Sequence, residues 1–321
     1  MGYVNEVKEK TVFVIGGSGG LGREISKVMA AQGANITIFG RKQYLLDEAR
    51  TEILAARQVE LQVINAVAGD MGVASSAYSI LNSQPRLPDV LYCVAGGTPA
   101  ECGFLIDLEP EIFERCMTNN YYSSLYPAQA ILKRWVQDDT NAEIPPSPKL
   151  RKIIFVNSSA SLVPVPGYLA YSTAKAAQRA LADTMRLEVT RYSGPKSTYT
   201  VQCIFAHNYI TQTFLEEQKM KPDLCKRIEG TTATDVATLG KHFPHATKIA
   251  PEIVAAVASN DFAVTDKRLE PQFLWASGIG SSPKRGWGIV DSLLALLASL
   301  LFPLIRRDIE KKCQGDAFRS E

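Results

Sequence analysis

TVFVIGGSGGLG, residues 11–22, is the stretch that decides the fold. It opens with an apolar, β-branched run typical of a buried strand, and a glycine-rich turn follows at once. Glycine at positions 16, 20 and 22 lets the backbone turn tightly, approach a phosphate and pack the next helix on the sheet. A helix from Gly22 to about Gly33 would offer free N–H groups and a positive dipole end to a pyrophosphate. The stretch therefore predicts a dinucleotide-binding loop between a first strand and a first helix.

The first 260 residues alternate short β-branched runs with longer helical patterns. Further strands are expected at 34–40, 59–68, 89–97, 152–159 and 199–207, and helices at 42–57, 109–137 and 169–192. Strands of this length separated by helices imply right-handed βαβ crossovers and a parallel sheet. We expect one doubly wound (Rossmann) α/β domain over residues 1–258, followed by an apolar helical appendage over 259–321.

Composition argues against several classes of protein. The formal net charge is +2, so the overall charge does not point to a nucleic-acid partner. Three histidines without an HExxH motif predict no metal site, and the polar N-terminus predicts no secretory signal. The cysteines show neither CxxC spacing nor a disulfide-framework pattern, and we expect reduced thiols in a cytosol-facing protein: Cys93, Cys102, Cys116, Cys203, Cys225 and Cys313.

The end of the second predicted strand indicates which dinucleotide binds. Phe39 and Gly40 are followed by Arg41 and Lys42, and no acid appears before Asp47. A carboxylate here would bind a ribose 2′-hydroxyl, whereas cations suit a 2′-phosphate. Arg41 can fork onto that phosphate and Lys42 can add a point charge, so NADPH/NADP is favoured over NADH. The alternative is that Arg41 and Lys42 are solvent-exposed residues at the start of a helix and bind no phosphate.

A third constellation joins Ser158, at the end of a predicted strand, to Tyr171 and Lys175 on one helix. Positions 171 and 175 lie one turn apart on the same face. An ammonium group there would favour the phenolate and lower the pKa of the tyrosine. Tyr171 could then donate a proton to a carbonyl oxygen that Ser158 also hydrogen-bonds, as hydride arrives.

Together these three motifs resemble the short-chain dehydrogenase/reductases, over roughly residues 10–215. Two departures are visible: Ile15 replaces the usual threonine before the glycine loop, and Ala206-His207 replaces a usual Pro-Gly after the sixth strand. The resemblance implies that Asn120 holds a water in a proton relay and joins the catalytic set. It also implies a set of cofactor-binding residues: Gly16, Ser18, Gly19, Gly20, Leu21, Gly22, Asp70, Met71, Ala95, Gly96, Gly97, Tyr171, Lys175 and Thr211. Homodimers or homotetramers built from the 109–137 and 169–192 helices are common in that family.

A narrower resemblance is to the 3-ketodihydrosphingosine (3-dehydrosphinganine) reductases. It is carried by the run SSASLVPVPGYLAYSTAKAAQRALADTMRLEV, the AGG at 95–97, the NYYSSLYPAQAIL helix and the apolar C-terminus. It implies NADPH-dependent reduction of the 3-keto group of 3-ketosphinganine at the endoplasmic-reticulum membrane, with the active site facing the cytosol. Two alternatives remain: a family member that reduces steroid, retinoid or acyl ketones, and a non-catalytic NADP-binding scaffold. An intact Ser158, Tyr171 and Lys175 argue against the scaffold.

The C-terminal segment 289–305 is apolar but contains Asp291, and Arg306 and Arg307 follow it. At seventeen residues it is short for a bilayer span, which needs about 20. It could span the membrane, lie at the interface or in an apolar substrate mouth as an amphipathic helix, or pack on the domain or on a second subunit. Upstream, 259–285 is expected to form a flexible flap that exposes Phe262, Phe273 and Trp275 to lipid.

The segment 207–230 is where substrate choice is expected to reside. Its apolar side chains could line a chain-binding pocket, or could equally serve helix packing: Tyr209, Ile210, Phe214, Leu215 and Met220.

Overall fold

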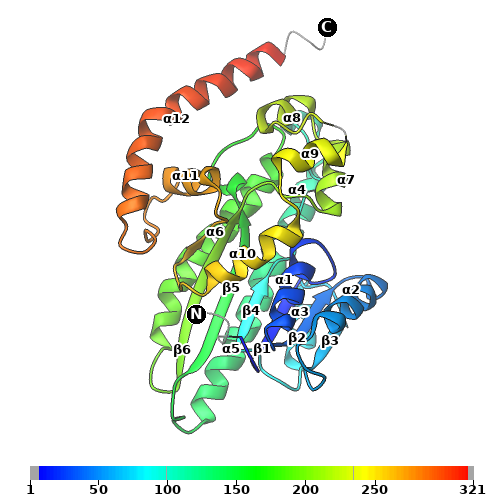
Figure 1. Cartoon of the computed structure of the whole chain (residues 1–321), viewed down its shortest axis with the longest axis vertical. Coiled ribbons are helices and arrows are strands. Elements are labelled where there is room, and N and C mark those ends of the chain that lie inside the picture. Colours follow the sequence, from blue (N-terminus) through cyan, green and yellow to red (C-terminus); the bar gives the residue numbers. More distant parts are fainter. Residues whose placement is uncertain (1–6, 99, 234, 317–321) are drawn as a thin grey trace.

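The computed structural model of the chain describes residues 7–98, 100–233 and 235–316. Its centre is a seven-stranded, wholly parallel sheet in the order β3-β2-β1-β4-β5-β6-β7 (Figure 1). The strands are β1 (Thr11–Ile15), β2 (Asn35–Gly40), β3 (Ile64–Ala68), β4 (Val90–Cys93), β5 (Lys149–Ser158), β6 (Ser197–Ala206) and β7 (Ala263–Val264). The predicted doubly wound fold is confirmed.

Helices cover both faces of the sheet. One face carries α1 (Gly20–Ala31), α2 (Gln43–Ala56) and α10 (Ala246–Val257), and the other carries α3 (Ala74–Asn82), α5 (Ser123–Asn141), α6 (Leu169–Glu188) and α11 (Leu269–Ser277). The side chains of β1 alternate between two hydrophobic cores, one on each face of the sheet, because successive strand residues point to opposite faces. Val12 and Val14 belong to the first core, whereas Phe13 and Ile15 belong to the second.

The order of the strands reverses between β1 and β4, which are neighbours in the sheet. The loops that leave these two strands therefore separate at the carboxyl edge, where doubly wound sheets bind their ligands. They stay close at their bases, since the N–H groups of Val94 and Ala95 both donate to the carbonyl of Ile15. This edge is consequently the place to look for a site.

Short helices gather at the same edge. They are α4 (Pro110–Met117), α7 (Gln212–Met220), α8 (Asp223–Glu229) and α9 (Val236–His242), with 3-10 turns at Leu105–Asp107 and Ser159–Ser161. A further 3-10 turn, Val189–Arg191, joins the end of α6 to the start of β6 at the opposite edge. A π-helical turn, η2 (Thr118–Tyr122), separates α4 from α5. The sequence predicted one uninterrupted helix over 109–137. The π turn interrupts it at the two asparagines, 119 and 120.

Two other expectations need correction. The strand expected at 59–68 starts only at Ile64. The flap expected over 259–285 does not expose its aromatic residues: Trp275 is fully buried, Phe262 is 7% exposed, and Phe273 is partly buried. Phe262 precedes β7 and Trp275 lies in α11, and both side chains pack in the core on that face of the sheet. The sheet and its core thus continue past residue 258, where the sequence placed the end of the domain.

The C-terminal helix α12 (Ile289–Asp316) extends away from the sheet (Figure 1). Within it, residues 289–313 are long and apolar enough to cross a membrane: an 18-residue window has a mean hydropathy of 1.9, and 11% of that window is buried. Its start is nevertheless part of the folded body. Asp291 is 1% exposed and accepts hydrogen bonds from Arg285 and from the indole of Trp275. Burial acts to raise the pKa of Asp291, but the Arg285 bonds outweigh it and leave that pKa below its usual value.

Candidate active site

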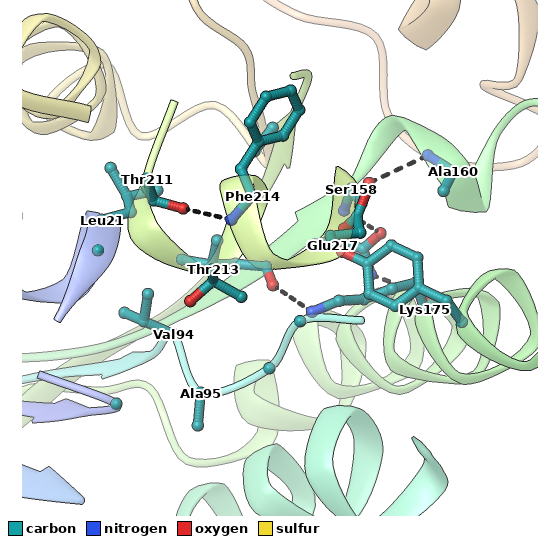
Figure 2. A pocket seen from close by; sticks show the side chains of 18 of the residues that line it. Leu21, Val94, Ala95, Ser158, Ala160, Lys175, Thr211, Thr213, Phe214 and Glu217 are labelled. Carbon is teal, nitrogen blue, oxygen red and sulfur yellow. Dashed lines mark hydrogen bonds between the residues drawn. The ribbon is translucent and has the colours of Figure 1, made fainter. Parts of the chain in front are cut away.

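A cavity of 650 Å³ lies at the carboxyl edge of the sheet (Figure 2). Nearly all the residues predicted from the sequence line it: Gly16, Ser18, Gly19, Gly20, Leu21, Gly22, Arg41, Asp70, Met71, Ala95, Gly96, Gly97, Ser158, Tyr171, Lys175 and Thr211. Lys42 and Asn120 do not line it. Lys42 is exposed at the residue before α2, and Asn120 is buried directly behind the wall.

The glycine loop has the close packing and the open side that the predicted dinucleotide cradle requires. A Cβ on Gly16 would lie 2.6 Å from the backbone nitrogen of Ala95, and one on Gly22 would lie 2.3 Å from the carbonyl oxygen of Gly16. No side chain fits at either position without moving the backbone. At Gly19, in contrast, nothing lies within 4 Å of the added carbon. Gly19 therefore borders open space at the N-terminus of α1, where free N–H groups favour an anion.

Two more loops complete the nucleotide side of the cavity. The exposed Arg41 guanidinium donates to Asn119 Oδ1 at 3.0 Å, which holds it over the rim. Asp70 Oδ1 accepts from the backbone N–H of Gly72 at 2.8 Å and so fixes the turn after β3. Thr211 caps α7, its Oγ1 accepting from Phe214 N at 3.0 Å, and its methyl group faces Gly20. The guanidinium of Arg41, the carboxylate of Asp70 and the hydroxyl of Thr211 thus lie around the glycine loop, at the positions that the sequence predicted.

Ser158 and Tyr171 meet inside the cavity, because the end of β5 lies beside the first turns of α6. Their side chains are hydrogen-bonded to each other. Ser158 Oγ also accepts from Ala160 N at 3.2 Å, which orients the hydroxyl (Figure 2). Burial raises the pKa of Tyr171, and the Ser158 hydrogen bond only partly opposes this. The net lowering of this pKa that the sequence predicted is therefore not found: burial outweighs the groups that lower the pKa, and Tyr171 stays protonated.

Lys175 is 3% exposed, with its ammonium nitrogen 5.8 Å from the centre of the Tyr171 ring. It donates to the carbonyl oxygen of Val156 at 2.8 Å and to Gln178 Oε1 at 3.3 Å. Burial lowers the pKa of Lys175 to about 8, because a desolvated ammonium group loses its proton more readily. A lysine with this pKa can give up and regain a proton near neutral pH.

Asn120 is fully buried in the π turn and braces the loop after β4. Its Oδ1 accepts from Gly97 N at 2.9 Å, and its Nδ2 donates to Gly97 O and to Cys116 O, both at 3.1 Å. The π turn explains the arrangement, since the extra residue in the turn directs Asn119 to Arg41 and Asn120 to the loop. Such π turns inside α-helices frequently occur at functional sites.

A buried polar network behind the catalytic residues was not predicted. Asn157 Nδ2 donates to the carbonyl of Lys175 at 2.8 Å and to Gln178 Oε1 at 3.0 Å, and Gln178 Nε2 donates to Ser124 Oγ at 2.7 Å. The network ties β5, α6 and α5 together at the reacting residues. The only sequence signal was a polar pair, Asn157-Ser158, ending an otherwise apolar strand.

The remaining wall of the cavity comes from α7, α8, α11 and α12. Tyr209 and Phe214 line it as predicted, but Ile210 and Leu215 pack with α9 residues and Met220 is 63% exposed. Polar residues that the sequence analysis did not single out also line this wall: Tyr168, Glu217 and Glu229. Ile305 and Ile309 of α12 close it.

The nucleotide cradle and the Ser158–Tyr171–Lys175 set agree with the comparison to protein families. The family model described as short chain dehydrogenase matches residues 10–221. The chain belongs to the short-chain dehydrogenase family. It is therefore an oxidoreductase, and the family predicted from the glycine loop and the YxxxK pair is confirmed.

Curated relatives of this short-chain dehydrogenase share a name. The chain is 30% identical over 306 residues to a PIGF/3-ketodihydrosphingosine reductase fusion protein of Schizosaccharomyces pombe, covering 95% of the chain and 57% of that protein. It is 29% identical to the 3-ketodihydrosphingosine reductase ksrA of Aspergillus fumigatus, covering 95% and 84%, and 30% identical to the Bos taurus 3-ketodihydrosphingosine reductase, covering 69% and 63%. The chain thus spans just over half of the fusion protein and most of the Aspergillus reductase.

Solved structures support the fold of this short-chain dehydrogenase. A short-chain dehydrogenase from Sphingobium yanoikuyae in complex with NADPH aligns with a TM-score of 0.65 at 19% identity, covering 85% of this chain and 93% of that one. Levodione reductase aligns with a TM-score of 0.65 at 15% identity, covering 81% and 96%. At these identities the likeness concerns the fold alone.

Proposed function

We propose that the chain reduces the 3-keto group of 3-ketodihydrosphingosine to dihydrosphingosine with NADPH, as a step of sphingolipid synthesis. The observation that carries the proposal is the composition of one cavity. Its walls include the Ser158–Tyr171–Lys175 set on one side and two isoleucines of the apolar helix α12 on the other. A ketone attached to a long alkyl chain needs polar residues that react at the carbonyl group and an apolar wall that contacts the chain. The names of the curated relatives support the same substrate.

Each catalytic residue has one role in this scheme. NADPH, when bound, supplies the hydride. Ser158 hydrogen-bonds the substrate oxygen and holds it beside Tyr171, whose hydroxyl carries the proton that the developing alkoxide needs. Because burial keeps Tyr171 protonated, it serves as the acid. Lys175 restores that proton, and Asn120 keeps the loop at Gly97 in place from behind the cavity wall.

Arg41 and Lys42 are the proposed partners of the cofactor's 2′-phosphate. Both side chains are exposed at the end of β2, beside a loop shaped for a pyrophosphate. A guanidinium pairs with phosphate through two parallel hydrogen bonds, so Arg41 contributes most of the selectivity for NADPH. Asn119 orients it from the π turn.

We further propose that the protein lies on the endoplasmic-reticulum membrane, with its active site towards the cytosol and α12 at the interface. Asp291 is buried in the protein, so only the part of α12 from residue 292 onward can enter lipid, and the face that carries Leu294, Ala295 and Ala298 packs on the protein. The apolar run from residue 292 to Ile305 rises about 21 Å, which is less than the ~30 Å of a hydrocarbon core. Its exposed leucines suit shallow insertion instead: Leu293, Leu296, Leu297, Leu300, Leu301 and Leu304.

The test follows the loss of NADPH absorbance with detergent-dispersed 3-ketosphinganine. Wild type should turn over, whereas Tyr171→Phe should lose about 10²–10⁴-fold in kcat while still binding NADPH. Tyr192→Phe, which alters a half-exposed tyrosine outside the cavity, is the matched control. If wild type binds NADPH but does not turn over 3-ketosphinganine, the assignment of this substrate is contradicted. Full activity in Tyr171→Phe would contradict the mechanism.

A further inference from the structure

A buried ionic cluster occupies the part of the cavity wall that α7 and α8 form. Lys221 Nζ lies 2.8 Å from Glu217 Oε1 and 2.6 Å from Glu229 Oε2. The lysine side chain is fully buried, and the two glutamate side chains are 14% and 13% exposed. Helices α7 and α8 are held together by this cluster, and both carboxylates line the cavity.

The cluster carries more negative than positive charge. In the described parts of the chain, Lys221 is the only lysine or arginine within salt-bridge distance of Glu217 or Glu229. Lys221 is also fixed, because its ammonium group lies over the rings of Tyr168 at 5.1 Å and Phe214 at 5.5 Å. Two carboxylates therefore share one cation in a place with little water, where a second cation would be strongly favoured.

The carboxylates also have acceptor capacity to spare. The Tyr168 hydroxyl has one proton but lies within hydrogen-bond distance of both Glu217 and Glu229, so it can satisfy only one of them at a time. Glu217 Oε2 accepts a single hydrogen bond, from Thr98. A carboxylate offers about four acceptor positions. Glu217 can thus accept a further donor.

The cluster lies next to the reacting groups. The ring centres of Tyr168 and Tyr171 are 6.0 Å apart, and Tyr168 is the N-cap residue of α6, three positions before Tyr171. Glu217 is near enough for its charge to contribute to the raised pKa of Tyr171, after burial. Figure 2 shows Glu217 on the cavity wall together with Ser158 and Lys175. A group held by Glu217 would therefore sit beside the carbonyl that Ser158 holds.

We propose that Glu217, assisted by Glu229, binds the ammonium group on the carbon adjacent to the substrate ketone. This inference rests on the proposed function and adds the basis of its selectivity. In 3-ketosphinganine the nitrogen is two bonds from the carbon that receives hydride, so it must lie beside the catalytic residues. The ammonium group supplies the second cation that the cluster lacks. N-acylated sphingoid ketones and uncharged ketones cannot supply it, and they are discriminated against.

The experiment compares 3-ketosphinganine with its N-acetyl derivative, whose nitrogen is an uncharged amide, in wild type and in Glu217→Gln. A charge-assisted hydrogen bond corresponds to roughly a 10- to 100-fold effect. Wild type should prefer the amine at least about tenfold in kcat/KM, and Glu217→Gln should lose that preference by lowering kcat/KM for the amine alone. Glu216→Gln, altering an exposed neighbour on the same helix, should keep the preference.

The outcomes separate this inference from the function on which it rests. Equal losses for both substrates in Glu217→Gln, or no preference for the amine in wild type, would overturn ammonium recognition while leaving the reductase assignment intact. No turnover of 3-ketosphinganine by wild type would overturn both. Should Glu217→Gln fail to fold, inhibition of wild type tests the inference instead. The inhibition constant of dodecylamine, competing with 3-ketosphinganine, should be at least about tenfold lower than that of dodecanol. Equal inhibition would overturn the inference.

Discussion

The backbone at Gly96 runs directly against the side chain of Asn120. A Cβ on Gly96 would lie 2.5 Å from Asn120 Oδ1 and 3.3 Å from Lys175 Nζ, and the residue has φ +151°. Only glycine fits here without strain, because L side chains rarely adopt this backbone conformation. The loop after β4, the π turn and Lys175 are therefore packed closely around Gly96, where there is no room for a side chain.

Gly96→Ala should consequently abolish most of the activity. The added methyl group must displace Asn120, which releases Gly97 and shifts the cavity wall next to Lys175. We expect a loss of stability of about 1–3 kcal/mol and at least about a tenfold loss in kcat/KM. Thermal unfolding and NADPH oxidation measure the two effects. Gly194→Ala, where nothing lies within 4 Å of the added carbon, is the control and should behave as wild type.

Lys175 should make the protein less stable at neutral pH than it would be with an apolar residue there. Its pKa is about 8 when folded and 10.5 when unfolded, so the unfolded state binds more protons between these values. The free energy of unfolding of wild type therefore rises relative to that of Lys175→Met as pH rises from about 8 to 10.5. Below pH 8 the variant exceeds wild type in this free energy by the largest amount. The pH-dependent part amounts to about 1–3 kcal/mol.

Chemical denaturation of both proteins across this pH range measures that difference. The variant should be inactive at every pH. Lys241→Met, altering an exposed lysine, is the control. A stability difference between wild type and Lys175→Met that stays constant from pH 7 to pH 10 would contradict the lowered pKa.

Arg41→Ala should change which dinucleotide is used. Removing the guanidinium leaves a 2′-phosphate without its bidentate partner, so KM for NADPH should rise about 10- to 100-fold while KM for NADH changes little. Steady-state kinetics with both cofactors checks this, and Arg86→Ala, which alters an exposed arginine outside the cavity, is the control. An equal rise in both KM values would show that Arg41 supports the loop without reading the phosphate.

The exposed leucines of α12 should govern binding to lipid vesicles. Replacing Leu300 and Leu304 by glutamate puts charge on the outer face, where both side chains are more than 60% exposed. Co-sedimentation with vesicles containing anionic lipid should fall at least about tenfold, because two buried leucines contribute several kcal/mol. Leu61→Glu, altering a 92% exposed leucine far from α12 in the chain, should bind as wild type. Unchanged binding by the double variant would place the membrane contact elsewhere.

Much of this arrangement could be predicted because it depends on local sequence. The glycine loop, Arg41 and the Tyr171–Lys175 pair are set by spacing within one strand, turn or helix. The supporting contacts could not be predicted, because they join distant segments: Asn157 meets Gln178, and Glu217 meets Tyr168. Trp275 was expected to be exposed because Gly, Ser and Pro surround it. Its burial comes from Phe205 of β6, whose ring centre lies 4.6 Å away, and from the Arg179 guanidinium above it.

The burial of Asp291 has a mechanical consequence. Because this carboxylate fixes the first turn of α12 to Arg285 and Trp275, the helix cannot tilt freely on a hinge when its leucines enter lipid. Under the proposed function, any change in its depth would be passed to Ile305 and Ile309, and so to the shape of the cavity proposed to receive the alkyl chain. Bilayer thickness and lipid packing would then act as physical variables of the proposed reaction. The same polypeptide would have different chain-length preferences in membranes of different composition.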